Sequence, residues 1–375
     1  MSELLSPFRI RNVTFRNRVV VSPMLTYQAE GGKANDWHVM NLGQYAAGGA
    51  GLVFMESTKV DPHGCSTRKD CGIWSDEFVP GLARVADIIH QQGAMAGLQL
   101  GHSGRKAGMV LPWEGRVPLD LDSVPTPSGE TWQLVGPSAI AHNSKYKVPK
   151  ELTRDDIKAM INKWVKAAKR AARAGFDVLE LHCAHGYLGH QFLSPVANKR
   201  TDEYGGLLRD RMRFVVEMAT AVRSVWAESQ PLFLRISAVD NAGWTIDDSV
   251  ALAKELRRVG VDVIDCSSGG MGGDPLADTP PTYGYQVPYA ARIRREAGIM
   301  TMAVGLITDA HQAQGIIRSG EADLIAIGRE FLSDPHWPLH AAEVLGERTE
   351  GIMPHPYDYW LEKRRELALP PYGGT

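Results

Sequence analysis

Two imidazoles and a phenol lie within six residues of each other, at His182, His185 and Tyr187. They directly follow an apolar segment, Phe176–Leu181, of the kind that forms a buried strand. Neutral imidazole N–H groups can donate hydrogen bonds to an oxygen on which negative charge develops, and a phenol beside them can deliver a proton to the adjacent carbon. These residues therefore predict a site that polarises a carbonyl and protonates an enolate.

Other uses of the two histidines stay open at this stage. As metal ligands they would need a third ligand, and no carboxylate or cysteine is obviously placed to supply it. As structural histidines they would need buried partners. Nucleophilic catalysis is less favoured, because the chain has no G-x-S-x-G motif and Cys183 would face away from His182 in an alternating strand. A Schiff-base enzyme would need a strand-end lysine, where the sixth strand has Cys266.

The elements that would position these side chains repeat as an amphipathic helix, a glycine and a short apolar strand. The clearest unit begins with Thr153 as helix cap and Asp156 as its reciprocal partner, and Gly175 ends the helix. Strands are predicted at residues 18–22, 52–56, 96–100, 176–181, 232–237, 261–266, 299–303 and 323–327. Eight strands alternating with helices predict the α/β fold of a (β/α)8 TIM barrel.

A doubly wound open sheet is the alternative fold, but no G-x-G-x-x-G follows the first strand. Residues 103–150 contain several prolines and no strong period, so we expect a capping insertion over the barrel mouth, with short strands of its own. The tail 354–375 is expected to form a C-terminal arm. Since no flexible linker divides the chain, residues 1–375 are predicted to form one domain.

Glycines and polar side chains follow several strands where barrel enzymes carry their chemistry. Gly305 and Gly328 follow the last two strands, and Arg329 adds a charged donor, so this side of the mouth is predicted to hold a phosphate. Gln99 and Arg235 emerge from apolar strands, where a heteroaromatic ring with carbonyl and imide edges would satisfy both. The alternative is that Arg235 pairs with a strand-end carboxylate, Glu180 or Glu56.

The composition excludes several classes of partner. The formal net charge of −2 gives no electrostatic basis for binding nucleic acid or an anionic membrane. The N-terminus lacks the charged region and the long apolar run that a signal peptide combines, and no apolar run is long enough to span a membrane. The four cysteines are scattered without a C-x-x-C pair, which argues against a disulfide framework and against a zinc site. A cytoplasmic location and no bound metal are therefore expected.

Several longer motifs identify a family. The chain resembles the Old Yellow Enzyme family of FMN-dependent ene-reductases, in the branch that contains bacterial xenobiotic reductase A, and the resemblance covers nearly the whole sequence. The matching segments are Asn17–Arg18, Ser22–Met24, Asn35–His38, Gly72–Asp76, Gln99–Lys106, His182–Leu188, Asn198–Gly206, Ile327–Arg329 and Pro356–Glu362.

The resemblance implies a noncovalent FMN over the barrel mouth, reduced by NADPH or NADH. The histidines would bind the carbonyl of an activated alkene together with Tyr27, and Tyr187 would protonate the α-carbon. Trp360 would enter the site of a neighbouring subunit, which implies a homodimer or a tetramer. The residues implied to bind the flavin are Ser22, Pro23, Met24, Leu25, Ser57, Gln99, Arg235, Gly305, Gly328 and Arg329.

Two positions depart from the pattern of that branch. Leu25 stands where a cysteine is usual near the flavin, and leucine cannot donate a hydrogen bond, so we expect an altered flavin potential. Val304 stands where xenobiotic reductase has a tryptophan, which suggests a roomier substrate pocket.

The function predicted from sequence is reduction of α,β-unsaturated carbonyl or nitro compounds by a flavin oxidoreductase dependent on NADPH or NADH. A flavin dehydrogenase or isomerase dedicated to one catabolic or biosynthetic step is the first alternative. A metal-dependent barrel hydrolase that uses His182 and His185 is the second.

Overall fold

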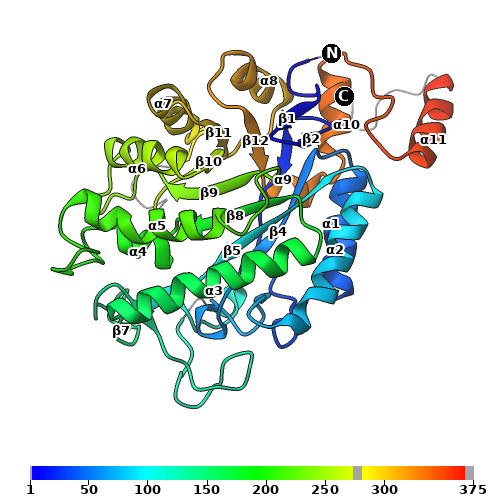
Figure 1. The fold of residues 1–375 in the computed structure, drawn as a ribbon. Coiled ribbons are helices and arrows are strands. Elements are labelled where there is room, and N and C mark those ends of the chain that lie inside the picture. The colour runs from blue at the N-terminus through cyan, green and yellow to red at the C-terminus, as the bar shows by residue number, and fades with distance from the viewer. Residues whose placement is uncertain (1, 116, 273–280, 368–375) are drawn as a thin grey trace.

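Eight parallel strands form a closed barrel in a computed structural model, which describes residues 2–115, 117–272 and 281–367 (Figure 1). Their spatial order is β10-β11-β12-β3-β4-β5-β8-β9, which confirms the predicted TIM barrel. The strands are β3 (Val19–Val21), β4 (Leu52–Lys59), β5 (Met95–Gly101), β8 (Val178–Cys183), β9 (Leu232–Ser237), β10 (Val263–Ser267), β11 (Met300–Ala303) and β12 (Leu324–Ile327). Each predicted strand overlaps an observed one, and the largest difference is that β4 continues to Lys59 instead of ending at residue 56.

Helices cover the outside of the barrel and connect successive strands (Figure 1). They are α1 (Asp36–Ala47), α2 (Val79–Gln91), α3 (Arg154–Arg173), α5 (Leu208–Arg223), α6 (Ile246–Arg258), α7 (Val287–Ala297) and α8 (Ala310–Arg318). The predicted cap of α3 is present: the Thr153 hydroxyl accepts from the Asp156 N–H at 3.1 Å, and the Asp156 carboxylate accepts from the Thr153 N–H at 3.0 Å. Two further short helices follow strands β8 and β12, namely α4 (Leu188–Leu193) and α9 (Arg329–Ser333).

Alternation along each strand separates two cores. One apolar cluster lies inside the barrel and includes Phe54, Phe233 and Met302, together with residues of the N-terminal hairpin β1 (Phe8–Ile10) and β2 (Val13–Phe15). The larger cluster lies between the strands and the helices and includes Cys183 and Cys266, which therefore face away from the barrel axis as alternation predicts. Cys183 and Cys266 therefore lie on the opposite side of the strands from His182, which faces the barrel interior.

The segment after β5 folds back over the carboxyl ends of the strands. Its short strands β6 (Val135–Gly136) and β7 (Lys150–Glu151) pair in parallel, and a small apolar cluster that includes Leu121 and Trp132 holds it together. Its Lys106 ammonium donates to the carbonyl of His185 at 2.9 Å. The segment 103–150 thus contacts the loop that follows β8.

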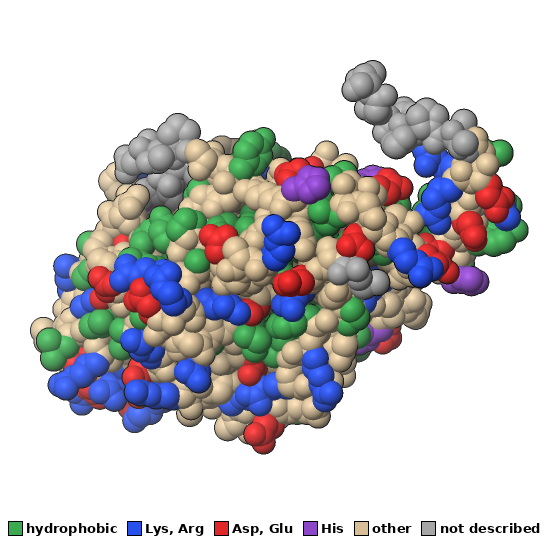
Figure 2. Space-filling view, turned by 90° about the horizontal axis from the view of Figure 1, so that it is seen from above, with side chains coloured by type: hydrophobic (Ala, Val, Ile, Leu, Met, Phe, Trp, Pro, Cys, Tyr) green, Lys and Arg blue, Asp and Glu red, His purple; other side chains and the backbone are tan. Residues whose placement is uncertain are grey.

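The chain ends in α10 (Trp337–Val344) and α11 (His355–Glu366), and α11 projects from the barrel (Figures 1 and 2). The predicted arm 354–375 is therefore seen as far as residue 367, and residues 368–375 lie outside the described part. Figure 2 shows acidic and basic side chains interspersed on one face, without a single-sign patch among the described residues drawn there. Within the described part of the chain, no helix combines the length and the apolar character that a membrane crossing needs.

Candidate functional site

A cavity of about 280 Å³ opens at the carboxyl ends of the strands. Seven of the residues predicted to bind the flavin line it, and Val304 lies beside them. These seven are Ser22, Pro23, Met24, Arg235, Gly305, Gly328 and Arg329. The predicted Leu25 follows Met24 and is half-buried, while Ser57 and Gln99 are buried on β4 and β5. The structure therefore brings seven of the ten predicted flavin residues to one cavity.

Bare backbone is required at one of the two predicted phosphate glycines. Gly305 has φ +120°, and a Cβ there would lie 2.8 Å from Nε2 of Gln286, so a side chain is excluded. At Gly328 a Cβ would meet Met24 Sδ at 3.5 Å, an ordinary contact, so that glycine is not forced by packing. Arg329 is exposed beside the cavity, free of the burial that would tie up its guanidinium. The set fits an anion held by backbone amides and one arginine.

A layer of polar side chains lies inside the barrel directly below this cavity. Gln99 donates to Glu180 Oε1 at 2.7 Å, and Arg235 Nε lies 3.1 Å from Asp265 Oδ2. The direct partner of Arg235 is therefore Asp265, neither Glu180 nor Glu56, because inward positions on β9 and β10 are in register. Glu180 Oε2 and both oxygens of Asp265 have no hydrogen-bond partner among the described residues.

Burial dominates the electrostatics of this layer. It raises the pKa of Glu180 to about 8, with Asp265 adding to the rise and Arg235 opposing it. Burial also raises the pKa of Asp265, again against the attraction of Arg235. One guanidinium is thus shared by two carboxyl groups, and at neutral pH a single ionised carboxylate is enough to balance it. The remaining polar atoms are those that a ring with imide and carbonyl edges could engage.

The two histidines of the opening motif form a hydrogen-bonded chain. The N–H of Ala184 donates to His182 Nδ1 at 3.1 Å, so Nε2 of His182 carries the proton. That Nε2 lies 3.3 Å from His185 Nδ1, and His185 Nε2 lies 2.6 Å from Ser267 Oγ. Burial, reinforced by the positive charge of Arg235, lowers the pKa of both imidazoles well below the usual value. Burial therefore favours the neutral form of both imidazoles.

The loop that carries these histidines is strained and firmly held. His185 has φ +58° and Gly186 has φ +74°, a left-handed pair that costs energy at the histidine. A Cβ at Gly186 would lie 2.3 Å from the carbonyl oxygen of Gly270. Its N–H donates to His190 Nδ1 at 2.9 Å, and its carbonyl accepts from Gln191 at 2.7 Å. The surroundings therefore fix the direction of His185.

The phenol of Tyr187 lies beside the histidines and between two lysines. Its ring centroid is 4.8 Å from that of His182. The Lys59 ammonium lies 5.1 Å from the ring centroid, and that of Lys106 lies 5.8 Å away. Sequence reasoning missed Lys59 because it ended the strand at residue 56, and it gave no role to Ser267. The inward parity of β10 is the signal that could have found Ser267. Alternation from Phe54 would point Lys59 outward, and a register shift between Met55 and Thr58, which the sequence pattern does not show, changes that parity.

Tyr27 lies on the loop between β3 and α1. It has φ +57°, and its ring meets that of Trp113 edge-on at 5.8 Å, so the capping segment reaches it. The preceding residue, Thr26, donates from both its N–H and its hydroxyl to Glu56 Oε2, at 2.8 and 2.6 Å. Glu56 thus anchors the loop that carries Leu25 and Tyr27.

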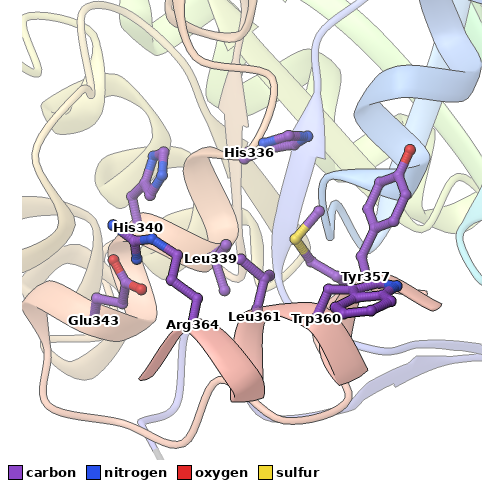
Figure 3. Close-up of a pocket in the computed structure, with 9 residues that line it drawn as sticks. His336, Leu339, His340, Glu343, Tyr357, Trp360, Leu361 and Arg364 are labelled. Atoms are coloured by element: carbon purple, nitrogen blue, oxygen red, sulfur yellow. The ribbon is translucent and has the colours of Figure 1, made fainter. Parts of the chain in front are cut away.

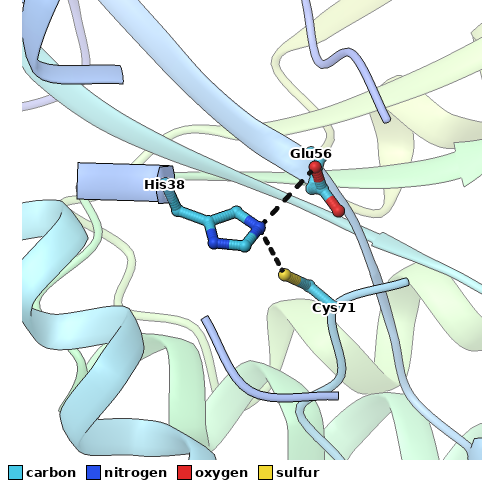
Figure 4. Close-up of side chains that lie close together, drawn as sticks. All are labelled: His38, Glu56 and Cys71. Atoms are coloured by element: carbon cyan, nitrogen blue, oxygen red, sulfur yellow. Dashed lines mark hydrogen bonds and ion pairs between the residues drawn. The ribbon is translucent and has the colours of Figure 1, made fainter. Parts of the chain in front are cut away.

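Glu56 also belongs to a buried cluster that the scattered cysteines did not predict. His38 Nε2 lies 3.2 Å from Cys71 Sγ and 4.0 Å from Glu56 Oε2 (Figure 4). Within the described part of the chain, this is the group of side chains whose atoms could together surround a metal ion. Burial raises the pKa of Cys71 well above its usual value and lowers that of His38 to about 4. Neutral groups that hydrogen-bond to one another therefore account for the cluster. His182 and His185, the metal ligands of the alternative hydrolase hypothesis, are not part of it.

Trp360 lies apart from the mouth. It is 70 % exposed on α11 and lines a second cavity of about 580 Å³, between α11 and α10 (Figure 3). Tyr357 and Leu361 of α11 face Leu339 of α10 across this cavity. Within one chain, the structure thus does not bring Trp360 to the other site residues.

Comparison with known proteins covers nearly the whole chain. The model of the NADH:flavin oxidoreductase / NADH oxidase family matches residues 3–347. The NADPH dehydrogenase of Geobacillus sp. (strain WCH70) is 44% identical over 347 residues, 92% of this chain and 94% of that protein. The NADPH dehydrogenase of Listeria monocytogenes serotype 4a (strain HCC23) is 44% identical over 356 residues, 94% of this chain and 97% of that protein.

Solved structures share the fold at lower identity. Morphinone reductase in complex with tetrahydroNAD has a TM-score of 0.74 and 27% identity, over 92% of this chain and 91% of that one. The old yellow enzyme homologue from Zymomonas mobilis has a TM-score of 0.72 and 26% identity, over 91% and 92% of the two chains. The barrel fold is thus shared with morphinone reductase and with an old yellow enzyme homologue.

Proposed function

The chain belongs to the NADH:flavin oxidoreductase / NADH oxidase family, the Old Yellow Enzyme family, and is an FMN oxidoreductase that uses a nicotinamide reductant; from this premise we propose that it reduces activated C=C bonds. The substrates would be α,β-unsaturated carbonyl or nitro compounds. The observation that carries the proposal is the grouping of two neutral histidines and Tyr187 beside the strand-end cavity.

The residues around the cavity suit FMN. Gly305, Gly328 and Arg329 would hold its phosphate, while Gln99 and Arg235 would face its pyrimidine edge. Ser22, Pro23, Met24, Leu25 and Ser57 would line the ring. When bound, FMN supplies the hydride that it has taken from NADPH or NADH. The lining of one cavity by seven of these residues, among them Arg235 and Arg329, supports this assignment.

The histidines must change partners to hold a substrate oxygen. His182 donates its Nε2 proton to His185 in the structure, and this proton can turn to an incoming oxygen. His185 can then donate from Nδ1 in the tautomer whose Nε2 accepts a hydrogen bond from the Ser267 hydroxyl, 2.6 Å away. Ser267 thus supports either tautomer of His185. Two donors on one oxygen draw electron density from the alkene and activate its β-carbon.

Tyr187 would complete the reaction. Its phenol would give the proton to the α-carbon, on the side of the substrate away from the hydride donor. Tyr27, held by Trp113 and by the Thr26–Glu56 contact, would bound the substrate pocket on its other side. Val304 in the cavity wall leaves room for a bulky substrate.

We propose a homodimer or tetramer in which Trp360 reaches a neighbouring site. Helix α11 buries none of its described side chains in the single chain, and its exposed aromatic residues would gain partners from a second copy. Four buried free cysteines are compatible with a reducing cytoplasm. Light scattering of Trp360→Ala against the native protein tests the assembly; an unchanged mass together with unchanged substrate affinity would remove this role.

The decisive experiment separates the two half-reactions in a stopped-flow instrument. Tyr187→Phe is expected to slow reoxidation by cyclohexenone by about 10²-fold or more and to leave reduction by NADPH nearly intact. His182→Ala is expected to weaken binding of a phenol, seen as loss of its long-wavelength charge-transfer band. Fast reoxidation in Tyr187→Phe would exclude the proton-donor role. Failure of the native protein to reduce cyclohexenone would favour a dedicated dehydrogenase or isomerase, and a colourless zinc protein would favour a hydrolase.

A further inference from the structure

A lysine lies wholly inside the protein at the end of β4. Lys59 has no exposed surface, and its ammonium lies 3.0 Å from Ser57 Oγ and 3.6 Å from Asp70 Oδ2. A buried ammonium is costly unless an opposite charge and hydrogen bonds compensate it. Lys59 has no role in the flavin binding or the substrate binding proposed above, so its burial must have another cause.

Asp70 keeps the lysine charged. Its two oxygens accept four hydrogen bonds, from the N–H and the hydroxyl of Ser66 and from the same groups of Thr67. These donors are arranged as an ionised carboxylate requires. Burial by itself lowers the pKa of Lys59, but the charge of Asp70 and the neighbouring Tyr187 outweigh it and raise that pKa. Lys59 is accordingly an ammonium ion, which rules it out as an amine nucleophile.

The cation lies near the phenol of Tyr187, which follows strand β8. Strand β5 separates β4 from β8, and it ends in Gly101. A Cβ at Gly101 would lie 2.4 Å from Ser57 Oγ, so the missing side chain makes room for the hydroxyl to which the Lys59 ammonium donates. Lys59 Nζ lies 5.1 Å from the ring centroid of Tyr187. At this separation in a buried site, a cation acts strongly on a charge that forms on the ring.

The second lysine near the ring is differently engaged. The ammonium of Lys106 donates to two backbone carbonyls, those of His185 at 2.9 Å and Gly270 at 3.1 Å. Burial lowers the pKa of Lys106 to about 8. Lys106 therefore holds the capping segment to the histidine loop. The ammonium of Lys59 instead contacts the side chains of Ser57 and Asp70.

We propose that Lys59 is a positioning residue for proton transfer, whose ammonium stabilises the phenolate that Tyr187 becomes when it gives its proton to the substrate. In that step the O–H bond of Tyr187 breaks and leaves its electron pair on the oxygen. The electron pair of the enolate forms the new Cα–H bond. Solvent then returns a proton to the phenolate. The proposal rests on the function proposed above, because it requires Tyr187 to be the donor.

The test compares Lys59→Met with the charge-keeping Lys59→Arg. Lys59→Met is expected to slow reoxidation by cyclohexenone at least tenfold and to leave the rate of reduction by NADPH within twofold of the native rate. The pH profile of the reoxidation rate should also shift in this variant. Lys59→Arg should recover most of the rate. Lys166→Met, which removes an exposed lysine from α3, is the matched control for net charge. Equal reoxidation rates in Lys59→Met and the native protein would overturn the proposal.

A second measurement does not depend on turnover. The tyrosinate absorbance that disappears in Tyr187→Phe belongs to Tyr187, and in Lys59→Met it should appear at a higher pH than in Lys59→Arg, because a nearby cation favours the phenolate. A purely structural role for Lys59 would leave this signal unmoved. If Lys59→Met does not fold, Lys59→Gln, which keeps a donor for Ser57 and Asp70, replaces it in both measurements.

A double-mutant cycle separates the two proposals. In the Tyr187→Phe background, Lys59→Met should cause no further loss of reoxidation rate, because the phenolate no longer forms. Additive losses would refute the assignment of Lys59 and leave the donor role of Tyr187 in place. If Tyr187→Phe by itself leaves reoxidation unchanged, the proposed function fails, and the result is read independently of Lys59.

Discussion

Two buried cations sit on different strands of the same barrel mouth, and they are satisfied to different degrees. Lys59 on β4 faces Asp70, whose oxygens accept four hydrogen bonds from the chain. Arg235 on β9 faces Asp265, whose oxygens accept none among the described residues. The first pair is complete within the protein, while the second leaves buried polar atoms below the cavity.

The difference indicates what each region is for. A network that is complete without a ligand holds its shape at all stages of a reaction, which suits a residue that supports proton transfer. A network with unsatisfied atoms beneath a cavity gains most from a bound group with matching donors and acceptors. We therefore expect the β9–β10 region to depend on the cofactor and the β4 region to be independent of it.

Removal of the Arg235 guanidinium is expected to have the largest effect. In Arg235→Met, two buried carboxyl groups lose their cation, so the free energy of unfolding should fall by about 3–5 kcal/mol and FMN should be lost on purification. Urea denaturation and the absorbance of the purified protein measure both. Arg235→Lys, which keeps the charge, should retain part of the stability. Full flavin occupancy in Arg235→Met would contradict the dependence of this region on the cofactor.

Removal of the counter-ion of Lys59 is expected to cost less and to spare the flavin. In Asp70→Asn, the ammonium of Lys59 stays buried without a carboxylate, and amide donors face the N–H groups of Ser66 and Thr67. The free energy of unfolding should fall by about 3 kcal/mol. Flavin content should stay at the native level, since Asp70 does not contact the cavity. If this variant lost its flavin, the separation between the two regions would be wrong.

The sequence predicted the strand-end residues around the cavity better than the partners of the two buried cations. Strand periodicity located all eight barrel strands, and Gly305, Gly328 and Arg329 could be placed at strand ends from local pattern alone. The partner of Arg235 could not, because the register between β9 and β10 decides that Asp265, and not Glu180, meets it. Register is a property of the closed barrel, and local sequence does not contain it.

Lys59 and Cys71 were missed for a related physical reason. The run Ser57–Lys59 is polar, so hydrophobic periodicity ends the strand too early, although the backbone continues in the barrel. Cys71 meets His38 and Glu56 only through tertiary contact between three separate segments, which no spacing rule describes. Polar residues that are satisfied by distant partners are therefore the ones that sequence reasoning overlooks.

The pH dependence of stability offers a third comparison, through Glu56. Burial raises the pKa of Glu56 to about 7, against the opposing hydrogen bonds from Thr26. The folded protein thus binds this proton more tightly than the unfolded chain, so the contribution is full below the unfolded pKa and is lost as the pH rises through about 7. Between about pH 5 and pH 8, stability relative to Glu56→Gln should fall by ~2 kcal/mol. Parallel unfolding curves for both proteins would show that Glu56 is ionised throughout.

The smallest expected effect concerns Leu25, which connects the two regions through the cofactor edge. Leu25 precedes Thr26, so the Glu56 contact fixes its backbone, while its side chain offers no donor. In Leu25→Cys, a thiol could donate weakly to charge that develops on the reduced flavin, and about 1 kcal/mol of such stabilisation corresponds to a rise of roughly 20 mV in the two-electron potential. Leu25→Ala is the control, because it opens the same space without a donor. Equal midpoint potentials in the native protein and Leu25→Cys would mean that this position does not tune the flavin, and that the unsatisfied Arg235 layer is the stronger determinant.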